Sequence, residues 1–239
     1  MQGILYIVST PIGNLEDITI RALRILKEVD LIASEDPRTT LKLLSHYEIK
    51  KPLISYTEHK WYFSGTPHKE KQKNIILEEL LQGKNIALVS RAGTPLISDP
   101  GYELVNKLLE ENIKVVPIPG VSAVVTALSV SGLATDRFIF EGFLPIKKSK
   151  VAKRLKDINT STATIIFYES PYRVVKTLRE IQKHFGNRRV VLARELTKLY
   201  EESIRGTIDE VIAKLESSKI LGEFTIIVEG FKEIEEHRD

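Results

Sequence analysis

Apolar segments of strand length alternate with amphipathic helical segments along the first half of the chain, and this alternation strongly limits its possible folds. Strands are predicted over residues 4–8, 31–34, 85–89 and 114–116. Helices are predicted over residues 19–28, 38–47, 69–82 and 102–111. Repeated strand and helix units favour a largely parallel sheet, because parallel neighbours are joined by a crossover connection that is usually helical.

Three short loops rich in Pro and Gly directly follow strands of this series. They cover residues 9–14, 90–95 and 117–122, and each precedes a helical pattern. Gly lets a backbone approach a ligand closely, and Pro holds the loop that presents it. Because open α/β sheets bind ligands at the carboxyl ends of their strands, the three loops predict one shared crevice.

The second half of the chain is less regular and predicts a second domain. Its strands are expected over residues 138–142, 163–168, 189–193, 203–206 and 224–229, and its helices over 122–130, 151–158, 172–185 and 208–217. Two prolines and a glycine within residues 117–120 interrupt any continuous element. We therefore expect an N-terminal α/β domain over 1–117 with a largely parallel sheet, a C-terminal α/β domain over 118–232 with a mixed sheet, and an acidic tail over 233–239.

Composition excludes several classes of protein. The 239 residues are 42% apolar and 28% charged, which is typical of a soluble globular chain. Cys is absent, which excludes thiol catalysis, disulfides and thiolate metal sites, and the five His lack metal-binding spacing, so no metal is expected. No signal peptide or membrane span is predicted, and we expect a cytoplasmic protein without membrane contact.

Familiar nucleotide-binding and hydrolase motifs are also missing. None of the 13 glycines lies two positions from another, so the GxGxxG pattern cannot occur. The GxSxG and GxxxxGK[ST] patterns are also absent from the chain. This argues against a dinucleotide-dependent oxidoreductase, an α/β hydrolase and a P-loop NTPase. The prediction that remains is a ligand held mainly by the Pro and Gly loops.

Seven motifs follow one another between Gly3 and Gly230. They are Thr10-Pro-Ile-Gly-Asn-Leu-Glu-Asp, Glu35-Asp36 with Arg38, Ala92-Gly-Thr-Pro-Leu-Ile-Ser-Asp-Pro-Gly, Pro117-Ile-Pro-Gly with Ser122-Ala123, Phe140-Glu-Gly-Phe-Leu-Pro, Phe167-Tyr-Glu-Ser-Pro with Arg173, and Ala193-Arg-Glu-Leu-Thr-Lys. In this order they closely resemble the ribosomal RNA small subunit methyltransferase I family of the tetrapyrrole-methylase superfamily.

This resemblance implies a fold, a reaction and partners. The fold is two α/β domains of the tetrapyrrole-methylase type with the donor site in the cleft between them. The donor is S-adenosylmethionine, and the acceptor is the ribose 2′-hydroxyl of a cytidine in the decoding region of 16S rRNA. The implied partners are 16S rRNA or the 30S ribosomal subunit, and a second copy of the chain in a homodimer.

The resemblance also assigns site residues, motif by motif. Donor contacts are expected from Pro11, Gly93, Thr94, Ser122, Ala123, Tyr168 and Leu196. A ribose hydroxyl is a poor nucleophile at neutral pH, so its reaction needs a base or a cation beside the developing alkoxide. The candidates for that catalytic role are Lys198, Glu195, Glu35 and Asp36, and the sequence does not choose the base among them.

Three features depart from the family pattern. Arg91 stands where the family has Asp in the second loop, and Asp36-Pro37-Arg38 replaces Asp-Thr-Arg. Many members also carry a further helical tail after the segment that ends near Gly230, and we expect contacts from that tail to be absent here.

Other interpretations of these features remain open. The chain could be an enzyme of the same fold that methylates a tetrapyrrole precursor, or a non-catalytic RNA-binding homologue, which Arg91 would favour. Lysines and an arginine over residues 147–156 predict contacts with RNA phosphates or a solvated helix face. The aromatic segment 61–63 predicts a base-stacking platform or a small hydrophobic cluster.

Several polar residues with a predicted functional role also have a plausible structural one. Glu35 and Asp36 are also suited to capping a helix. Glu169 and Arg173 have the spacing of a surface ion pair on a helix, and Asp99 begins a sequence typical of a simple turn.

Overall fold

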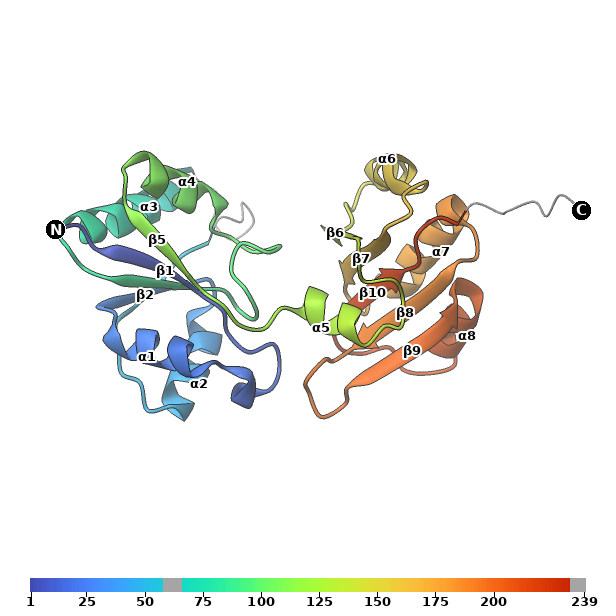
Figure 1. The fold of residues 1–239 in the computed structure, drawn as a ribbon, viewed down its shortest axis with the longest axis horizontal. Helices are drawn as coiled ribbons and strands as arrows, with labels where there is room; N and C mark the ends of the chain where they lie inside the picture. Colours follow the sequence, from blue (N-terminus) through green and yellow to red (C-terminus); the bar gives the residue numbers. More distant parts are fainter. Residues whose placement is uncertain (58–65, 233–239) are drawn as a thin grey trace, which may run out of the picture. The chain divides into compact units, whose positions relative to one another are not determined.

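The chain consists of two compact units, Met1–Ser122 and Ala123–Asp239, which we call unit 1 and unit 2 (Figure 1). The computed structural model describes residues 1–57 and 66–232, so the aromatic segment 61–63 and the acidic tail lie outside the described residues. Each unit is built on its own five-stranded sheet. The predicted α/β class with two sheets is confirmed.

Unit 1 alternates strands and helices as the sequence predicts. Its elements are β1 (Ile4–Val8), η1 (Leu15–Asp17), α1 (Ile20–Glu28), β2 (Leu31–Ser34), α2 (Pro37–His46), β3 (Leu53–Ser55), α3 (Thr66–Leu81), β4 (Ile86–Val89), α4 (Tyr102–Glu110) and β5 (Lys114–Ile118). The strands lie in the order β3-β2-β4-β1-β5, and every pairing among them is parallel. The predicted parallel sheet is therefore confirmed, and β3 is a strand that the sequence analysis missed.

Helices cover both faces of this sheet because successive residues of a strand point to opposite sides. In β4, Ile86 and Leu88 pack into one apolar cluster with residues of α3 and α4. Ala87 and Val89 pack into another cluster with residues of α1 and α2. In Figure 1 the two helix pairs accordingly lie on opposite faces of the sheet. Burial on both faces accounts for the uninterrupted apolar runs that identified these strands.

Strand β5 extends further than predicted, through Pro117 to Ile118. The sequence analysis ended this strand at Val116 and placed a domain division after Pro117. Proline lacks an N–H group and so removes one bond of a sheet ladder, but an edge strand tolerates this loss. β5 is the edge strand beside β1, where Pro117 is in register with Ile7.

Unit 2 combines a mixed sheet with its helices. Its elements are α5 (Ala123–Ser129), β6 (Phe138–Phe143), α6 (Lys148–Ile158), β7 (Thr164–Glu169), α7 (Val174–Phe185), β8 (Arg189–Arg194), β9 (Glu202–Thr207), α8 (Ile208–Glu216) and β10 (Phe224–Val228). The strands lie in the order β6-β7-β10-β8-β9. β6 and β7 are parallel, whereas the other neighbours are antiparallel, so the predicted mixed sheet is confirmed.

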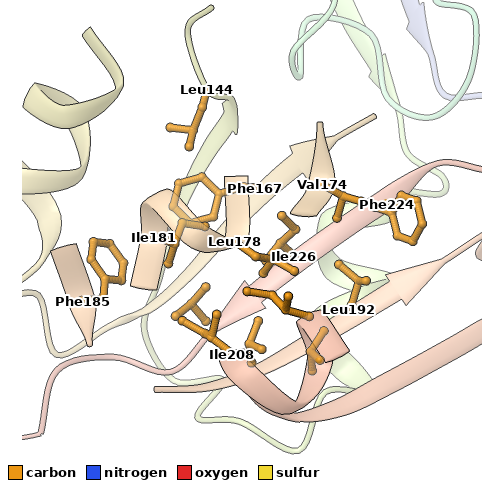
Figure 2. Packing of buried hydrophobic residues seen from close by; sticks show 14 of the residues in the cluster. Leu144, Phe167, Val174, Leu178, Ile181, Phe185, Leu192, Ile208, Phe224 and Ile226 are labelled. Carbon is orange, nitrogen blue, oxygen red and sulfur yellow. The ribbon is translucent and has the colours of Figure 1, made fainter. Parts of the chain in front are cut away.

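One large apolar cluster joins the sheet of unit 2 to α6, α7 and α8 (Figure 2). Phe167 of β7 is fully buried there, close to Leu178 and Ile181 of α7 in the figure. The opposite face of the sheet faces α5, which contacts β10. The sheet is thus held on both sides, which fixes the positions of the loops at its ends.

Replacing Phe167 with Ala tests this packing. We expect the free energy of unfolding to fall by about 3–5 kcal/mol, because the change removes buried apolar surface and leaves a cavity. Urea unfolding followed by circular dichroism measures the loss. Tyr172→Ala is the matched control, since Tyr172 is 96% exposed and its truncation removes no core contact. Equal losses in the two variants would contradict the packing described.

Candidate active site

The strand order of unit 1 identifies where a ligand is expected to bind. From β1 the chain crosses β4 to reach β2, whereas from β4 it crosses β1 to reach β5. The connections therefore leave β1 and β4 in opposite directions, and a crevice opens beyond the carboxyl ends of such a strand pair. The loops over residues 9–14 and 90–95 follow these two strands, and that over residues 117–122 lies at the end of neighbouring β5. We call them the first, second and third loops.

Hydrogen bonds join the three loops. Thr10 and Gly93 exchange two backbone bonds of 2.9 Å, which link the first loop to the second. The hydroxyl of Thr94 donates to the carbonyl oxygen of Val121 at 3.0 Å, which links the second loop to the third. Since this bond uses the only proton of the Thr94 hydroxyl, the Ser9 hydroxyl donates to Thr94 Oγ1 across 3.0 Å.

Two glycines permit this close approach. Gly93 has φ +82, and a Cβ atom there would lie 3.3 Å from Ile12 Cγ2. At Gly120 a Cβ atom would lie 2.8 Å from Ser9 Cβ, which is too close for any larger residue without movement. The predicted role of Gly as a residue of close backbone approach therefore holds in the second and third loops.

One buried polar atom in the first loop has no hydrogen-bond partner among the described residues. Thr10 is 5% exposed, and its Oγ1 atom accepts and donates no bond. Buried hydroxyls are nearly always satisfied, so an exception is a candidate contact for water or a bound ligand. The sequence analysis selected Pro11, which is half-buried, but missed its neighbour Thr10, because no sequence signal reports an unsatisfied atom.

Acidic side chains lie beside the second loop. The backbone N–H of Arg91 donates to Glu35 Oε2 at 3.0 Å, so Glu35 holds the start of this loop. Asp36 caps α2, accepting bonds from the N–H groups of Arg38 and Thr39. Burial alone would raise the pKa of Asp36, but these hydrogen bonds outweigh it and, together with the charge of Arg91, lower the pKa.

Asp99 lies between the second loop and α4, and it is more than a turn residue. Burial raises the pKa of Asp99 to about 7, and the charge of Glu35 adds to this effect, while a hydrogen bond with Ser90 opposes it. Ser90 itself is only 3% exposed. The interpretation of Asp99 as part of a simple turn is therefore incomplete, because the carboxyl group titrates near neutral pH beside a second carboxylate.

In unit 2 an ion-pair cluster surrounds Lys198. Its Nζ atom lies 3.0 Å from Glu195 Oε1 and 2.9 Å from Glu223 Oε2. Glu195 Oε1 also accepts a bond from the backbone N–H of Glu223 at 2.9 Å. Burial alone would lower the pKa of Lys198, but the hydrogen bonds to Glu223 and Glu195 outweigh it and raise the pKa. Lys198 is therefore a cation at neutral pH.

The same cluster keeps Glu195 ionised. Burial alone would raise its pKa, but the bonds from Lys198 and from the Glu223 N–H outweigh burial and lower it. Glu195 has φ +50, and a Cβ atom on Gly222 would lie 2.5 Å from Glu195 Cγ, so Gly222 leaves room for this side chain. Glu223 was missed in the sequence because only the pairing of β8 with β10 brings it to Glu195.

The remaining predicted site residues lie either at the loops of unit 1 or near the Lys198 cluster of unit 2. Ser122 is the last residue of the third loop and of unit 1, and Ala123 begins α5 of unit 2. Tyr168 lies near the end of β7 and is half-buried, and Leu196 follows β8 and is 8% exposed. The structure thus gathers Pro11, Glu35, Asp36, Gly93 and Thr94 at the carboxyl edge of one sheet, and Tyr168, Glu195, Leu196 and Lys198 at one edge of the other.

Glu169 and Arg173 do not form the surface pair considered from the sequence. The side chain of Glu169 is fully buried, accepts a bond from Thr177 Oγ1 at 2.6 Å and lies 3.4 Å from Arg173 Nη2. Arg173 also donates to the carbonyl oxygen of Leu144 at 2.8 Å. The pair therefore joins the loops after β6 and β7, which is a structural role.

Two expected absences concern metals and membranes. Among the described residues no cluster of three or more His, Cys, Asp or Glu could hold a metal ion. Within the same part of the chain, no helix has the length and apolar character needed to cross a bilayer.

Comparison with known proteins decides the family. A family model described as tetrapyrrole (corrin/porphyrin) methylases matches residues 4–212. The chain is 51% identical over 229 residues to ribosomal RNA small subunit methyltransferase I of Halalkalibacterium halodurans, covering 96% of this chain and 76% of that protein. The chain belongs to the ribosomal RNA small subunit methyltransferase I family. The family member from Thermotoga maritima is 49% identical over 229 residues, covering 96% of this chain and 99% of that protein.

A more distant structure shows the fold. Uroporphyrin-III C-methyltransferase from Thermus thermophilus, solved in complex with S-adenosylhomocysteine, has a TM-score of 0.64 and 18% identity, covering 94% of this chain and 97% of that one. The tetrapyrrole-methylase type of fold and the family membership predicted from the seven motifs are both confirmed.

Replacing Thr94 with Val tests the connection between the loops in this family member. The change leaves the Ser9 hydroxyl and the Val121 carbonyl without their partner, so we expect a loss of about 1–3 kcal/mol in the free energy of unfolding. Urea unfolding measures it. Ser129→Ala is the control, because its hydroxyl bonds a carbonyl within one exposed helix turn. A loss at Thr94 no greater than that at Ser129 would show that the loops do not depend on this hydroxyl.

Replacing Asp99 with Asn tests its raised pKa. The folded pKa of about 7 exceeds the ordinary value of 3.8, so this group stabilises the fold at low pH, and its contribution is lost as pH rises through about 7. We therefore expect Asp99→Asn to be more stable than the natural chain at pH 8, with the difference disappearing toward pH 4. Urea unfolding across this range checks it. A difference that does not vary with pH would contradict the raised pKa.

Proposed function

We propose that this chain transfers a methyl group from S-adenosylmethionine to the ribose 2′-oxygen of a cytidine in the decoding region of 16S rRNA. The observation that carries the proposal is near 50% identity to ribosomal RNA small subunit methyltransferases I over 96% of the chain. Loops at the strand-order reversal of unit 1 support it, because this is where α/β sheets bind ligands.

The residues of the three loops fit a donor of this chemistry. The unpartnered Oγ1 of Thr10 is a polar atom available to a ligand, and Gly93 leaves a space that a Cβ atom would fill. S-adenosylmethionine supplies an electrophilic methyl group on a sulfonium sulfur. We assign Pro11, Gly93, Thr94 and Ser122 to its binding, with Ala123, Tyr168 and Leu196 as contacts from unit 2.

The acceptor oxygen needs stabilisation as it loses its proton and bonds to the methyl carbon. A lysine ammonium has three N–H donors, and Lys198 uses two of them on Glu195 and Glu223. We assign the third to the acceptor oxygen, where the positive charge stabilises the developing alkoxide. Lys198 thus acts as a cation and does not itself remove the proton.

The carboxylates are less well suited to serve as the base. Asp36 is occupied by capping α2, and its lowered pKa makes it a weak proton acceptor. Glu195 accepts bonds from Lys198 and the Glu223 N–H on Oε1, and its lowered pKa makes it a weak proton acceptor. Glu35 keeps a free oxygen besides the one that binds the Arg91 N–H, so among these candidates we favour Glu35.

Arg91 is compatible with activity because of its surroundings. Glu35, Asp36 and Asp99 place three carboxyl groups beside the second loop, and the charge of Arg91 lowers the pKa of Asp36. The guanidinium is exposed and offsets this negative charge. This removes the main reason for treating the chain as a non-catalytic homologue.

We further propose that the chain works as a cytoplasmic homodimer on 16S rRNA or the 30S subunit. Sedimentation equilibrium tests the dimer. A tetrapyrrole precursor is the alternative acceptor, but the likeness to enzymes of that chemistry is at 18% identity and concerns the fold alone.

The test of the function uses purified 30S particles that lack the modification, naked 16S rRNA, and a tetrapyrrole precursor, each with tritiated S-adenosylmethionine. We expect transfer to RNA, with 2′-O-methylcytidine recovered after nuclease digestion. Transfer to the precursor alone, or binding of RNA with no transfer to any acceptor, would refute the proposal.

Lys198→Ala tests the catalytic role of the cation. We expect turnover to fall by about 100-fold, because the charge beside the developing alkoxide is lost, while donor affinity changes by less than about threefold. Lys198→Arg keeps the charge and should retain most of the activity.

The control for these variants is Lys176→Ala, at an exposed position on α7. Single-turnover methylation and donor titration together separate catalysis from binding. Equal losses in turnover and in donor affinity would make Lys198 a binding residue. An inactive Lys198→Arg with normal donor affinity would contradict purely electrostatic stabilisation.

A further inference from the structure

Four connections between strands of unit 2 meet at one edge of its sheet. Across β6 and β7, Phe143 is in register with Tyr168. Phe224, the first residue of β10, is in register with Glu169 at the end of β7 and with Arg194 at the end of β8. Glu202, the first residue of β9, is opposite Arg194. The segments after β6, after β7, between β8 and β9, and before β10 therefore lie along a line of about 19 Å.

Exposed apolar side chains are concentrated on this edge. Among the described residues of unit 2, six of the ten exposed large hydrophobic side chains belong to these four segments or the strand ends beside them: Phe143, Ile146, Tyr172, Leu199, Tyr200 and Leu221. We call this set the aromatic edge. Tyr172 is 96% exposed and Tyr200 is 73% exposed, so neither contributes to the core. Such a gathering indicates a binding surface.

The backbone that carries these side chains is held in place. The bond from Arg173 to the Leu144 carbonyl joins the segments after β6 and β7, and the ion pairs of Lys198 join the other two. A bulge between Phe140 and Gly142 alters the direction of the end of β6. The Phe143 ring, 56% exposed, lies 5.7 Å from the Tyr168 ring. The edge therefore presents aromatic side chains on a fixed frame.

Charge distribution favours a nucleic acid as the occupant. Lys147, Lys148, Lys150, Lys153 and Lys156 are exposed on and just before α6, which follows the Phe143 end of the edge. On the other side Glu202 pairs with Arg194, Glu195 and Glu223 share Lys198, and Glu201 accepts a bond from the Thr197 N–H, so carboxylates outnumber cations there and phosphates are expected at the α6 side of the edge. Lysines bind phosphates, and exposed aromatic rings stack on unpaired bases.

We propose that the aromatic edge binds unpaired RNA, with Tyr172, Tyr200 and Phe143 stacking on bases and the lysines of α6 contacting the adjoining phosphates. This inference rests on the proposed function for the identity of the RNA. It assigns the recognition of unpaired nucleotides to a surface distinct from the loops of unit 1, and it explains why large side chains remain exposed at this edge.

The experiment uses the full chain and a fluorescein-labelled single-stranded RNA of about 12 nucleotides, with a duplex of equal length for comparison. Fluorescence anisotropy gives affinity at several salt concentrations. We expect Tyr172→Ala combined with Tyr200→Ala to weaken single-strand binding at least about tenfold, because each stack lost costs about fivefold or more. The salt dependence should not change, and the two Tyr→Phe substitutions should preserve affinity.

Matched variants separate stacking from charge. Replacing Lys147, Lys148, Lys150 and Lys153 with Ala should flatten the slope of log affinity against log salt by up to about 2.8. The tyrosine variant, in contrast, should lose affinity with an unchanged slope. Tyr102→Ala, at a 69% exposed tyrosine of α4, should have no effect on RNA binding.

Two results would overturn the proposal. Unchanged RNA affinity in the double tyrosine variant is one. The other is a loss of self-association in that variant, seen by sedimentation while RNA affinity stays normal, which would make the edge an interface between copies of the chain. Donor titration and 30S methylation are measured in parallel, so RNA binding through the edge without methyl transfer would refute the proposed function and leave this inference intact.

Discussion

Two backbone hydrogen bonds between Thr10 and Gly93 hold the first and second loops together, and the site in unit 1 is built on this pairing. The pairing brings Thr94 to Ser9 and Val121, so that one hydroxyl connects all three loops. It requires Gly at position 93, where φ is +82 and the neighbouring Ile12 leaves little space. The backbone of the proposed donor site is thereby fixed before a ligand arrives.

Electrostatics distinguish the two groups of site residues. In unit 1, burial and the charge of Glu35 raise the pKa of Asp99, and the charge of Arg91 offsets the excess of carboxyl groups. In unit 2, Lys198 is stabilised as a cation by Glu195 and Glu223. The first arrangement leaves one proton exchangeable near neutral pH, and the second holds a permanent positive charge. In the proposed transfer to a ribose hydroxyl, Glu35 beside Asp99 would accept the departing proton and Lys198 would stabilise the oxygen that loses it.

Much of the fold could be predicted from the sequence because each unit buries its central strands on both sides. Strand boundaries such as Ile4–Val8 and Leu31–Ser34 coincide with uninterrupted apolar runs. β3 escaped prediction because its three residues, Leu53–Ser55, are too few to form a pattern. Pro117 was read as a break because sequence does not reveal that its strand lies at an edge.

The site was predictable only in part. The loop residues stand out because Pro and Gly leave a local signal, and the family resemblance added Lys198 and Glu195. No local sequence signal shows the contact of Glu223, the burial of Glu169 or the unsatisfied Oγ1 of Thr10. Each depends on strand register or on packing by distant residues. The exposed side chains of the aromatic edge are scattered from Phe143 to Leu221 in the sequence, and only the order of the strands assembles them.

Calorimetric titration with S-adenosylmethionine tests whether the three joined loops of unit 1 hold the methyl donor, as we propose. Gly93→Val is compared with Gly132→Val, because both glycines have positive φ, +82 and +72, but nothing lies within 4 Å of a Cβ atom at Gly132. We expect the natural chain and Gly132→Val to bind the donor alike, and Gly93→Val to bind it at least about 100-fold more weakly. Equal donor affinity in the two valine variants, with both folded, would contradict it.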